Sequence, residues 1–384
     1  MKTLVLLLAL AAQDKSFGSG LPALAQDKKG PPKVDPVRVD DAIKKGVSYL
    51  KGQIGKYGTI NKRRSEELIL WTLIHAGLAE ADPDVEKLLK TVLETPLEWT
   101  YNVSLQAMIL EELDRVKYQG RIQQCAQFLI DNQCKNGQWS YGEPDLFAKD
   151  TPTGGPRAVA SGGGSKAPKP GSTRTKPKVT RKVPIKQMKT GPAAGDNSNS
   201  QYAALGLRAC HDAGIVMPLE VVELAEKWWR ESTPSGGWDY HKGNGPYGSM
   251  TAGAVGGLTI YLYMQSKPWM KDKEVVAGLD WMAKNFAVDR NTGAVEDGGG
   301  QNGWQYYWLY AVERAGIFYG TETIGGHEWY VEGAKYLLGE QKADGSWQSK
   351  GADHAIWDTC FAVLFLRRAT RPLMDVASVD RAKK

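Results

Sequence analysis

LLGEQKADGSW, at Leu337–Trp347, is the most informative stretch of this 384-residue chain. It joins the apolar end of an amphipathic helix to a glycine turn and a tryptophan. The same arrangement recurs as LIDNQCKNGQW, which ends at Trp139, and more weakly as RESTPSGGW, which ends at Trp238. A unit that returns along one chain predicts an internal repeat.

Three glycines mark the length of the repeat. Gly77, Gly214 and Gly316 end the matching segments LIHAG, CHDAG and VERAG, each of which finishes an apolar helix. Once the insertion described below is set aside, their spacing corresponds to a repeat of about 50 residues. Caps such as Asp82 followed by Pro83 mark helix starts.

Each repeat is expected to contain two helices. The more amphipathic helix of each pair begins near residues 39, 84, 119, 219, 273 and 327. The more apolar partner, rich in small residues, begins near residues 65, 100, 198, 248, 304 and 354. Six such hairpins can close on themselves and leave no end repeat exposed. The sequence therefore predicts an all-α fold, an α6/α6 toroid with a double ring of about twelve helices.

The tryptophan segments also resemble the QW repeat of squalene cyclases. Gln341, Asp344, Gly345 and Trp347 stand where that repeat has them, and the resemblance covers roughly residues 39–370. It extends to the protein prenyltransferases, which share the toroid. It implies that the glutamine and tryptophan side chains are structural contacts between repeats rather than ligand contacts.

The catalytic motifs of the resembled enzymes are missing. There is no DxDD sequence, the acid of class II terpene cyclases, and the nearest fragment to a magnesium-binding DDxxD begins at Asp40 but ends at Lys44. The thioester sequence GCGEQ of complement-type toroids is absent too. Where prenyltransferases place zinc ligands, this chain has Asn302, Trp304 and Asp358. We therefore expect no metal and no cofactor.

A pocket could still lie where the inner helices begin, because their amino ends converge on one mouth of a toroid. Aromatic walls with a few polar groups are typical of a small-molecule site, whereas large aromatics could equally fill the middle and leave no pocket. The candidate ligand-binding residues are Tyr101, Asn199, Gln201, Tyr247, Trp304, Tyr306, Tyr307, Trp308 and Trp357.

His354 and Asp358 are the candidate catalytic pair. They are one helical turn apart on one face, so they could act as an acid-base couple or bind a metal together with a third ligand. The alternative is a hydrogen-bonded pair at a solvated rim.

The amino terminus resembles an export signal. Lys2 precedes an apolar run at residues 4–12, which is too short to span a bilayer, and Ala23 and Ala25 offer a cleavage site. Cleavage after Ala12 is an alternative. The expected divisions are a signal peptide at 1–25, a linker at 26–38, toroid repeats at 39–150 and 196–372, an insertion at 151–195 and a tail at 373–384. The protein is expected to be periplasmic or secreted, with no transmembrane segment in the mature chain.

The insertion at residues 151–195 carries ten Lys or Arg residues and no Asp or Glu, which accounts for the net charge of +6. Because it is rich in Gly, Pro, Ser and Thr and lacks apolar periodicity, it is expected to be a disordered surface loop. Its charge could hold the protein near an anionic surface or simply solvate it. Specific nucleic-acid binding is not expected.

Two functions remain open. The first is a non-catalytic binding or scaffold toroid for a hydrophobic ligand or protein partner, which the loss of every recognised catalytic set favours. The second is an enzyme that acts on an isoprenoid with Asp358 as acid, or on an extracytoplasmic glycan with carboxylates such as Glu296, Asp297 and Asp358.

Overall fold

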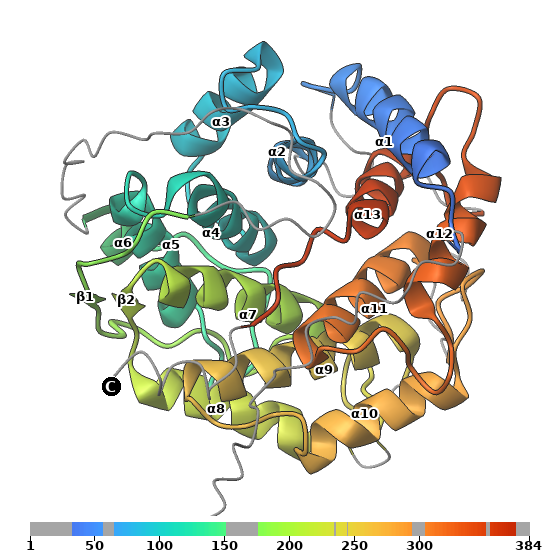
Figure 1. Ribbon diagram of the computed structural model, residues 1–384. Coiled ribbons are helices and arrows are strands. Elements are labelled where there is room, and N and C mark those ends of the chain that lie inside the picture. Colours follow the sequence, from blue (N-terminus) through green and yellow to red (C-terminus); the bar gives the residue numbers. More distant parts are fainter. Residues whose placement is uncertain are drawn as a thin grey trace, which may run out of the picture.

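The computed structural model describes residues 33–56, 65–150, 176–233, 236–243, 245–293, 304–350 and 354–373. Within these ranges the regular secondary structure is almost entirely helical, and the helices form two concentric rings (Figure 1). The inner ring consists of α2 (Glu66–His75), α4 (Thr100–Asp114), α7 (Asn197–Asp212), α9 (Gly248–Met264), α11 (Gln305–Tyr319) and α13 (Ala355–Arg367). The outer ring consists of α1 (Pro36–Lys51), α3 (Pro83–Glu94), α5 (Gln119–Asp131), α8 (Leu219–Glu231), α10 (Lys273–Lys284) and α12 (Trp329–Glu340).

The inner ring is closed. Each inner helix packs against the next one, from α2 through α4, α7, α9 and α11 to α13, and α13 packs against α2 again. This confirms the predicted all-α toroid, and each helix of the two rings begins within three residues of its expected position. The first repeat starts at Pro36, so the last three residues of the expected linker belong to α1.

Burial distinguishes the two rings. Every residue of α9 from Gly248 to Leu262 is buried, because this helix has neighbours on all sides. In contrast, α10 buries only Val275, Gly278 and Met282.

Close helix contacts in the inner ring depend on small residues. A Cβ atom added to Gly206 of α7 would lie 2.8 Å from the Cα atom of Ser104 in α4. None of the described helices is long and apolar enough to cross a membrane.

The loops that follow α5, α8 and α12 make matching contacts, and we call them the tryptophan loops (residues 132–139, 232–238 and 341–347). In each loop the tryptophan is fully buried, and its indole N–H donates to a carbonyl near the end of the preceding outer helix. These bonds join Trp139 to Leu129 at 2.7 Å, Trp238 to Trp229 at 2.9 Å and Trp347 to Leu337 at 2.9 Å. The tryptophans therefore fix each outer helix to the loop that leads inward.

Glutamine and glycine residues of these loops reach the next outer helix. Gln133 Nε2 donates to the Val221 carbonyl at 2.8 Å, and a Cβ on Gly137 would lie 2.3 Å from the Leu224 carbonyl oxygen. Because Gly137 has a φ of +94°, a side chain there would be strained as well. The outer helix α8 is therefore held against the loop after α5.

The same contact joins the last repeat to the first. Gln341 Nε2 donates to the Ala42 carbonyl of α1 at 2.8 Å. A Cβ on Gly345, which has a φ of +89°, would lie 2.5 Å from the Lys45 carbonyl oxygen. Residues about 300 positions apart thus meet by the geometry that links neighbouring repeats.

One predicted feature is wrong in part. Residues 176–195, expected to belong to a disordered loop, form an ordered segment, whereas residues 151–175 of the expected insertion lie outside the described residues. Strand β1 (Val183–Pro184) pairs in parallel with β2 (Ile215–Val216). The side chain of Ile185 is buried together with that of Val183. The short helix α6 (Leu146–Asp150) was not predicted from the sequence.

Polar contacts explain why this segment is ordered despite its composition. Gln187 Nε2 donates to the Ile130 carbonyl at 2.6 Å, and the Met188 N–H donates to Asp131 Oδ1 at 2.6 Å. Gln127 Nε2 donates to the carbonyl of Lys186 at 2.8 Å. The segment is therefore held to α5 by hydrogen bonds more than by apolar burial.

We expect two replacements in this region to differ. Replacing residues 178–194 with a short Gly/Ser linker should lower the free energy of unfolding by about 3 to 5 kcal/mol, because it removes two buried apolar side chains and several hydrogen bonds. The matched replacement of residues 152–174 should change it little, since the entropy of loop closure varies slowly with length. Urea denaturation of both variants measures the difference. Equal stability of the two variants would contradict the contacts described above.

Candidate functional site

The amino ends of the inner helices gather on one face of the toroid, because every hairpin enters the inner ring from the same side. We call this the aromatic face and define it by the half-buried or exposed side chains Trp99, Tyr141, Tyr240, Tyr247, Trp304 and Trp357. Trp304 and Trp357 lie 6.1 Å apart between ring centroids, and the hydroxyls of Tyr141 and Tyr240 lie 3.2 Å apart.

Below this face, tyrosines meet across the axis of the ring. The hydroxyls of Tyr101 and Tyr307 are 3.1 Å apart, and both contact the Ser198 hydroxyl. Tyr202 stacks on Tyr307 with ring centroids 6.2 Å apart. Burial raises the pKa of each of these three phenols, so they stay neutral. The structure thus brings together Tyr101 and Tyr307, as predicted, but they contact one another rather than line an open pocket.

Deeper along the axis, Tyr310 accepts a hydrogen bond from Trp71 Nε1 at 3.1 Å. Its ring lies 5.9 Å from that of Phe361. The guanidinium of Arg314 lies 4.1 Å from the Tyr310 centroid. The cavity beside these residues has a volume of only about 40 Å³.

Three predicted ligand-binding residues have other positions. Trp308 is fully buried and donates from Nε1 to the Ala287 carbonyl at 2.8 Å, outside the inner ring. Tyr306 is buried near Tyr336 of the outer helix α12. Asn199 donates from Nδ2 to the capping carboxylate before its own helix. The expectation that these three side chains line a pocket is therefore corrected.

Gln201 also lies deeper than expected. Its Oε1 accepts a hydrogen bond from Arg314 Nη2 at 3.1 Å, well below the amino ends of the helices. Arg314 was not predicted, because the candidate residues were chosen only at the amino ends of the inner helices. The available signal was a charged Glu-Arg pair, Glu313 and Arg314, inside the otherwise apolar segment VERAG.

His354 and Asp358 do lie together, but within the protein. His354 Nε2 is 3.6 Å from Asp358 Oδ1, and the imidazole stacks on Trp304 with centroids 4.5 Å apart. Asp358 Oδ2 accepts a hydrogen bond from the Ser349 N–H at 2.7 Å. Asp358 has no exposed surface, so the expected solvated rim is wrong for this residue.

Burial raises the pKa of Asp358 from its ordinary 3.8 to about 7. The carboxyl is thus partly protonated near neutral pH and could in principle donate a proton. Its bond to Ser349 shows a second role, which is to hold the loop after Trp347 against α13.

The positions at which prenyltransferases have zinc ligands are occupied here by Asn302, Trp304 and Asp358. Of these three residues, Asn302 lies outside the described residues. The described residues contain no group of three potential metal ligands.

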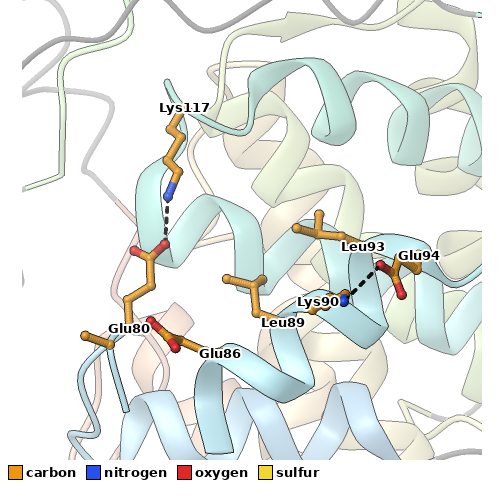
Figure 2. A pocket seen from close by; sticks show the side chains of 8 residues that line it. Glu80, Glu86, Leu89, Lys90, Leu93, Glu94 and Lys117 are labelled. Atoms are coloured by element: carbon orange, nitrogen blue, oxygen red, sulfur yellow. Dashed lines mark hydrogen bonds and ion pairs between the residues drawn. The ribbon is translucent and has the colours of Figure 1, made fainter. Parts of the chain in front are cut away.

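A larger groove lies on the outer ring, between α3 and Lys117, which precedes α5 (Figure 2). Its volume is about 590 Å³, and Leu89 and Leu93 form its apolar part. Lys117 Nζ lies 2.8 Å from Glu80 Oε1, as the dashed line in Figure 2 shows. Exposed ion pairs of this kind contribute little energy, and the groove presents no catalytic constellation. Its lining was not predicted.

Comparisons with solved structures identify the architecture. The type II terpene cyclase MstE from Scytonema matches with a TM-score of 0.52 and 13% sequence identity over 87% of this chain and 99% of that one. A variant of MstE in complex with its product, merosterolic acid A, matches with a TM-score of 0.50 and 13% identity over 88% and 98% of the two chains. The chain has a terpenoid cyclase-like fold.

A protein from Actinoplanes is similar to this chain to the same degree, with a TM-score of 0.51 and 15% identity over 87% and 99% of the two chains. No protein-family model matches the sequence, and a comparison with curated proteins gives no match. At such low identity the structural likeness establishes the fold and leaves the activity open.

The Asp358→Asn variant tests the environment of this carboxyl. Because the folded-state pKa is raised above the unfolded value, the folded protein binds the proton more tightly, and this stabilisation is lost as pH rises from about 4 through 7. Asparagine keeps the bond from Ser349 without a charge. We therefore expect the variant to exceed the natural protein in stability at pH 8 by on the order of 4 kcal/mol, and the difference to vanish near pH 4.

Urea denaturation at several pH values measures this difference. Glu313, whose pKa burial also raises to about 7, contributes equally to both proteins and does not affect the comparison. Parallel stability profiles for the two proteins would show that Asp358 ionises normally in the folded state.

Proposed function

We propose that this chain is a non-catalytic, exported binding toroid that holds a protein partner on its aromatic face. The observation that carries the proposal is the occupied axis of the inner ring. Tyr202, Tyr307 and Tyr310 extend across it, and the adjoining cavity of about 40 Å³ is far below the roughly 300 to 1,000 Å³ of ligand pockets. A polyprenyl substrate needs a cavity with a volume in the range of such ligand pockets.

The aromatic face supports a protein partner. Tryptophan and tyrosine are enriched at protein interfaces because they bury a large apolar area and keep a polar group for hydrogen bonding. Trp99 is 43% exposed and Tyr141 is 40% exposed, although both are large apolar side chains. A partner that covers them would remove this surface from water.

Export is proposed from the signal-like residues 1–25 and is independent of the fold. Attachment to an anionic surface is a further proposal. It is supported by Lys178, Arg181, Lys182 and Lys186, which are exposed on the ordered segment 176–195. Such contacts weaken as salt concentration rises.

A catalytic role for Asp358 is the second candidate, and its raised pKa favours it. The complete burial of this carboxyl and its bond to Ser349 favour the binding role instead. Glycan chemistry through Glu296 and Asp297 involves residues outside the described ranges.

Site-specific photo-crosslinking distinguishes the two candidates. A photoreactive phenylalanine analogue at position 99 reports on the aromatic face. At position 270 it is the matched control, because Met270 is 54% exposed and follows the carboxyl end of α9, on the opposite face. In the producing cells we expect one protein to crosslink from position 99 and not from position 270.

Equal crosslinking from both positions would contradict a partner on the aromatic face. Cyclisation of a polyprenyl substrate by the purified protein, abolished in Asp358→Asn, would contradict the absence of catalysis. Extraction of a stoichiometric terpenoid from the purified protein would show that the axis holds a ligand after all.

A further inference from the structure

The inner helix α11 carries a deeply buried arginine on the axis of the ring. Arg314 is 3% exposed, and its guanidinium lies 4.1 Å from the ring centroid of Tyr310 and 5.6 Å from that of Tyr202. Nη2 donates to Gln201 Oε1 at 3.1 Å. Aromatic rings with their hydroxyls and one amide supply no negative charge to balance this desolvated guanidinium.

One donor of this guanidinium has no hydrogen-bond acceptor among the described residues. It is Nη1 of Arg314, which is buried. The hydroxyls of Tyr202 and Tyr310 interact with Arg314 through its charge and through side-chain hydrogen bonding, but Nη1 itself has no hydrogen-bond partner. A buried polar group left in this state costs about 1 to 3 kcal/mol, and more when it is charged.

The unpaired guanidinium lines the small cavity of the axis. Trp71, Met108, Leu205 and Phe318 provide its apolar walls. Its volume of about 40 Å³ exceeds the roughly 10 to 15 Å³ that one water molecule needs, so a small ion fits.

The other cations of the lining have carboxylate partners. Lys176 Nζ lies 3.1 Å from Glu112 Oε2, and Arg371 Nε donates to the same oxygen at 2.7 Å. Arg208 Nε lies 3.3 Å from Asp212 Oδ2. Among the described residues that line the cavity, Arg314 is therefore the positively charged side chain to which no carboxylate is bonded.

Glu313 is the neighbour of Arg314 in the sequence, but its carboxylate is not bonded to this guanidinium. Its oxygens accept hydrogen bonds from the N–H of Thr370 at 3.0 Å and from the Thr370 hydroxyl at 2.5 Å. Burial raises its pKa to about 7, so it carries only part of a charge near neutral pH.

We propose that this cavity binds one small monovalent anion, a halide or a carboxylate no larger than formate, against Nη1 of Arg314. The anion balances the buried charge of the guanidinium and satisfies this donor. This site is independent of any partner on the aromatic face.

Thermal unfolding in defined anions tests the site. The protein is purified in sodium gluconate, whose anion is too large for the cavity, and bromide or formate then replaces gluconate at constant ionic strength. We expect a saturable rise in Tm of about 2 to 4 °C with bromide, with formate or with both. Which of the two acts distinguishes a halide from a carboxylate.

The Arg314→Gln variant should lose this response, whereas the matched control Arg230→Gln should keep it, because Arg230 lies in a surface cluster with Asp272 and Glu274. If Arg314→Gln does not fold, anomalous diffraction from bromide-soaked crystals of the natural protein decides. A bromide peak within hydrogen-bonding distance of Nη1 supports the proposal. A Tm in bromide and in formate that equals the Tm in gluconate, or water alone in the cavity of crystals soaked in saturating bromide and of crystals soaked in saturating formate, overturns it.

Discussion

The contact on which the rest of the structure depends joins the last repeat to the first. Gln341 donates to the carbonyl of Ala42, and Gly345 packs against the backbone at Lys45. Each such hydrogen bond contributes only about 1 kcal/mol, but it fixes the register of two outer helices that are far apart in the sequence. Since an open array of repeats would expose an apolar end on α1 and on α12, closure turns two exposed ends into one buried interface.

Closure also constrains the interior. Six inner helices that approach closely leave little space on the axis, and large side chains at Tyr202, Tyr307 and Tyr310 occupy it. The terpenoid cyclase-like fold is thus retained, with tyrosine side chains across part of the described interior. Partly exposed aromatic side chains lie where the inner helices begin. For this reason we propose that the aromatic face binds the partner.

The periodic part of the fold was predictable from the sequence. Repeated tryptophan loops and the glycines Gly77, Gly214 and Gly316 mark the ends of units, and local signals of this kind do not depend on distant contacts. The ordered segment at 176–195 was not predictable from composition, because bonds such as that from Met188 to Asp131 hold it. Those partners are distant in the sequence and leave no local pattern.

The candidate site was predicted less completely for a related reason. Trp304 and Trp357 lie near helix starts on one face, as their positions in the sequence indicate. The direction in which a side chain points from a helix that is buried on all sides cannot be predicted in this way, because such a helix has no polar stripe. Tyr306 and Trp308 consequently point to the outer layer, although they flank Tyr307 in the sequence. Arg314 was overlooked because it lies below the helix starts, and its partner Gln201 comes from a different repeat.

Hydrogen exchange tests the closed ring most directly. If the contact between Gln341 and Ala42 joins the ends, the amides of α1 and α12 should exchange through the same global unfolding as those of α7, with equal protection and equal denaturant dependence. In Gln341→Ala, α1 alone should lose protection first. Exchange of α1 and α12 in the natural protein through a separate opening, at much lower free energy than α7, would contradict the account.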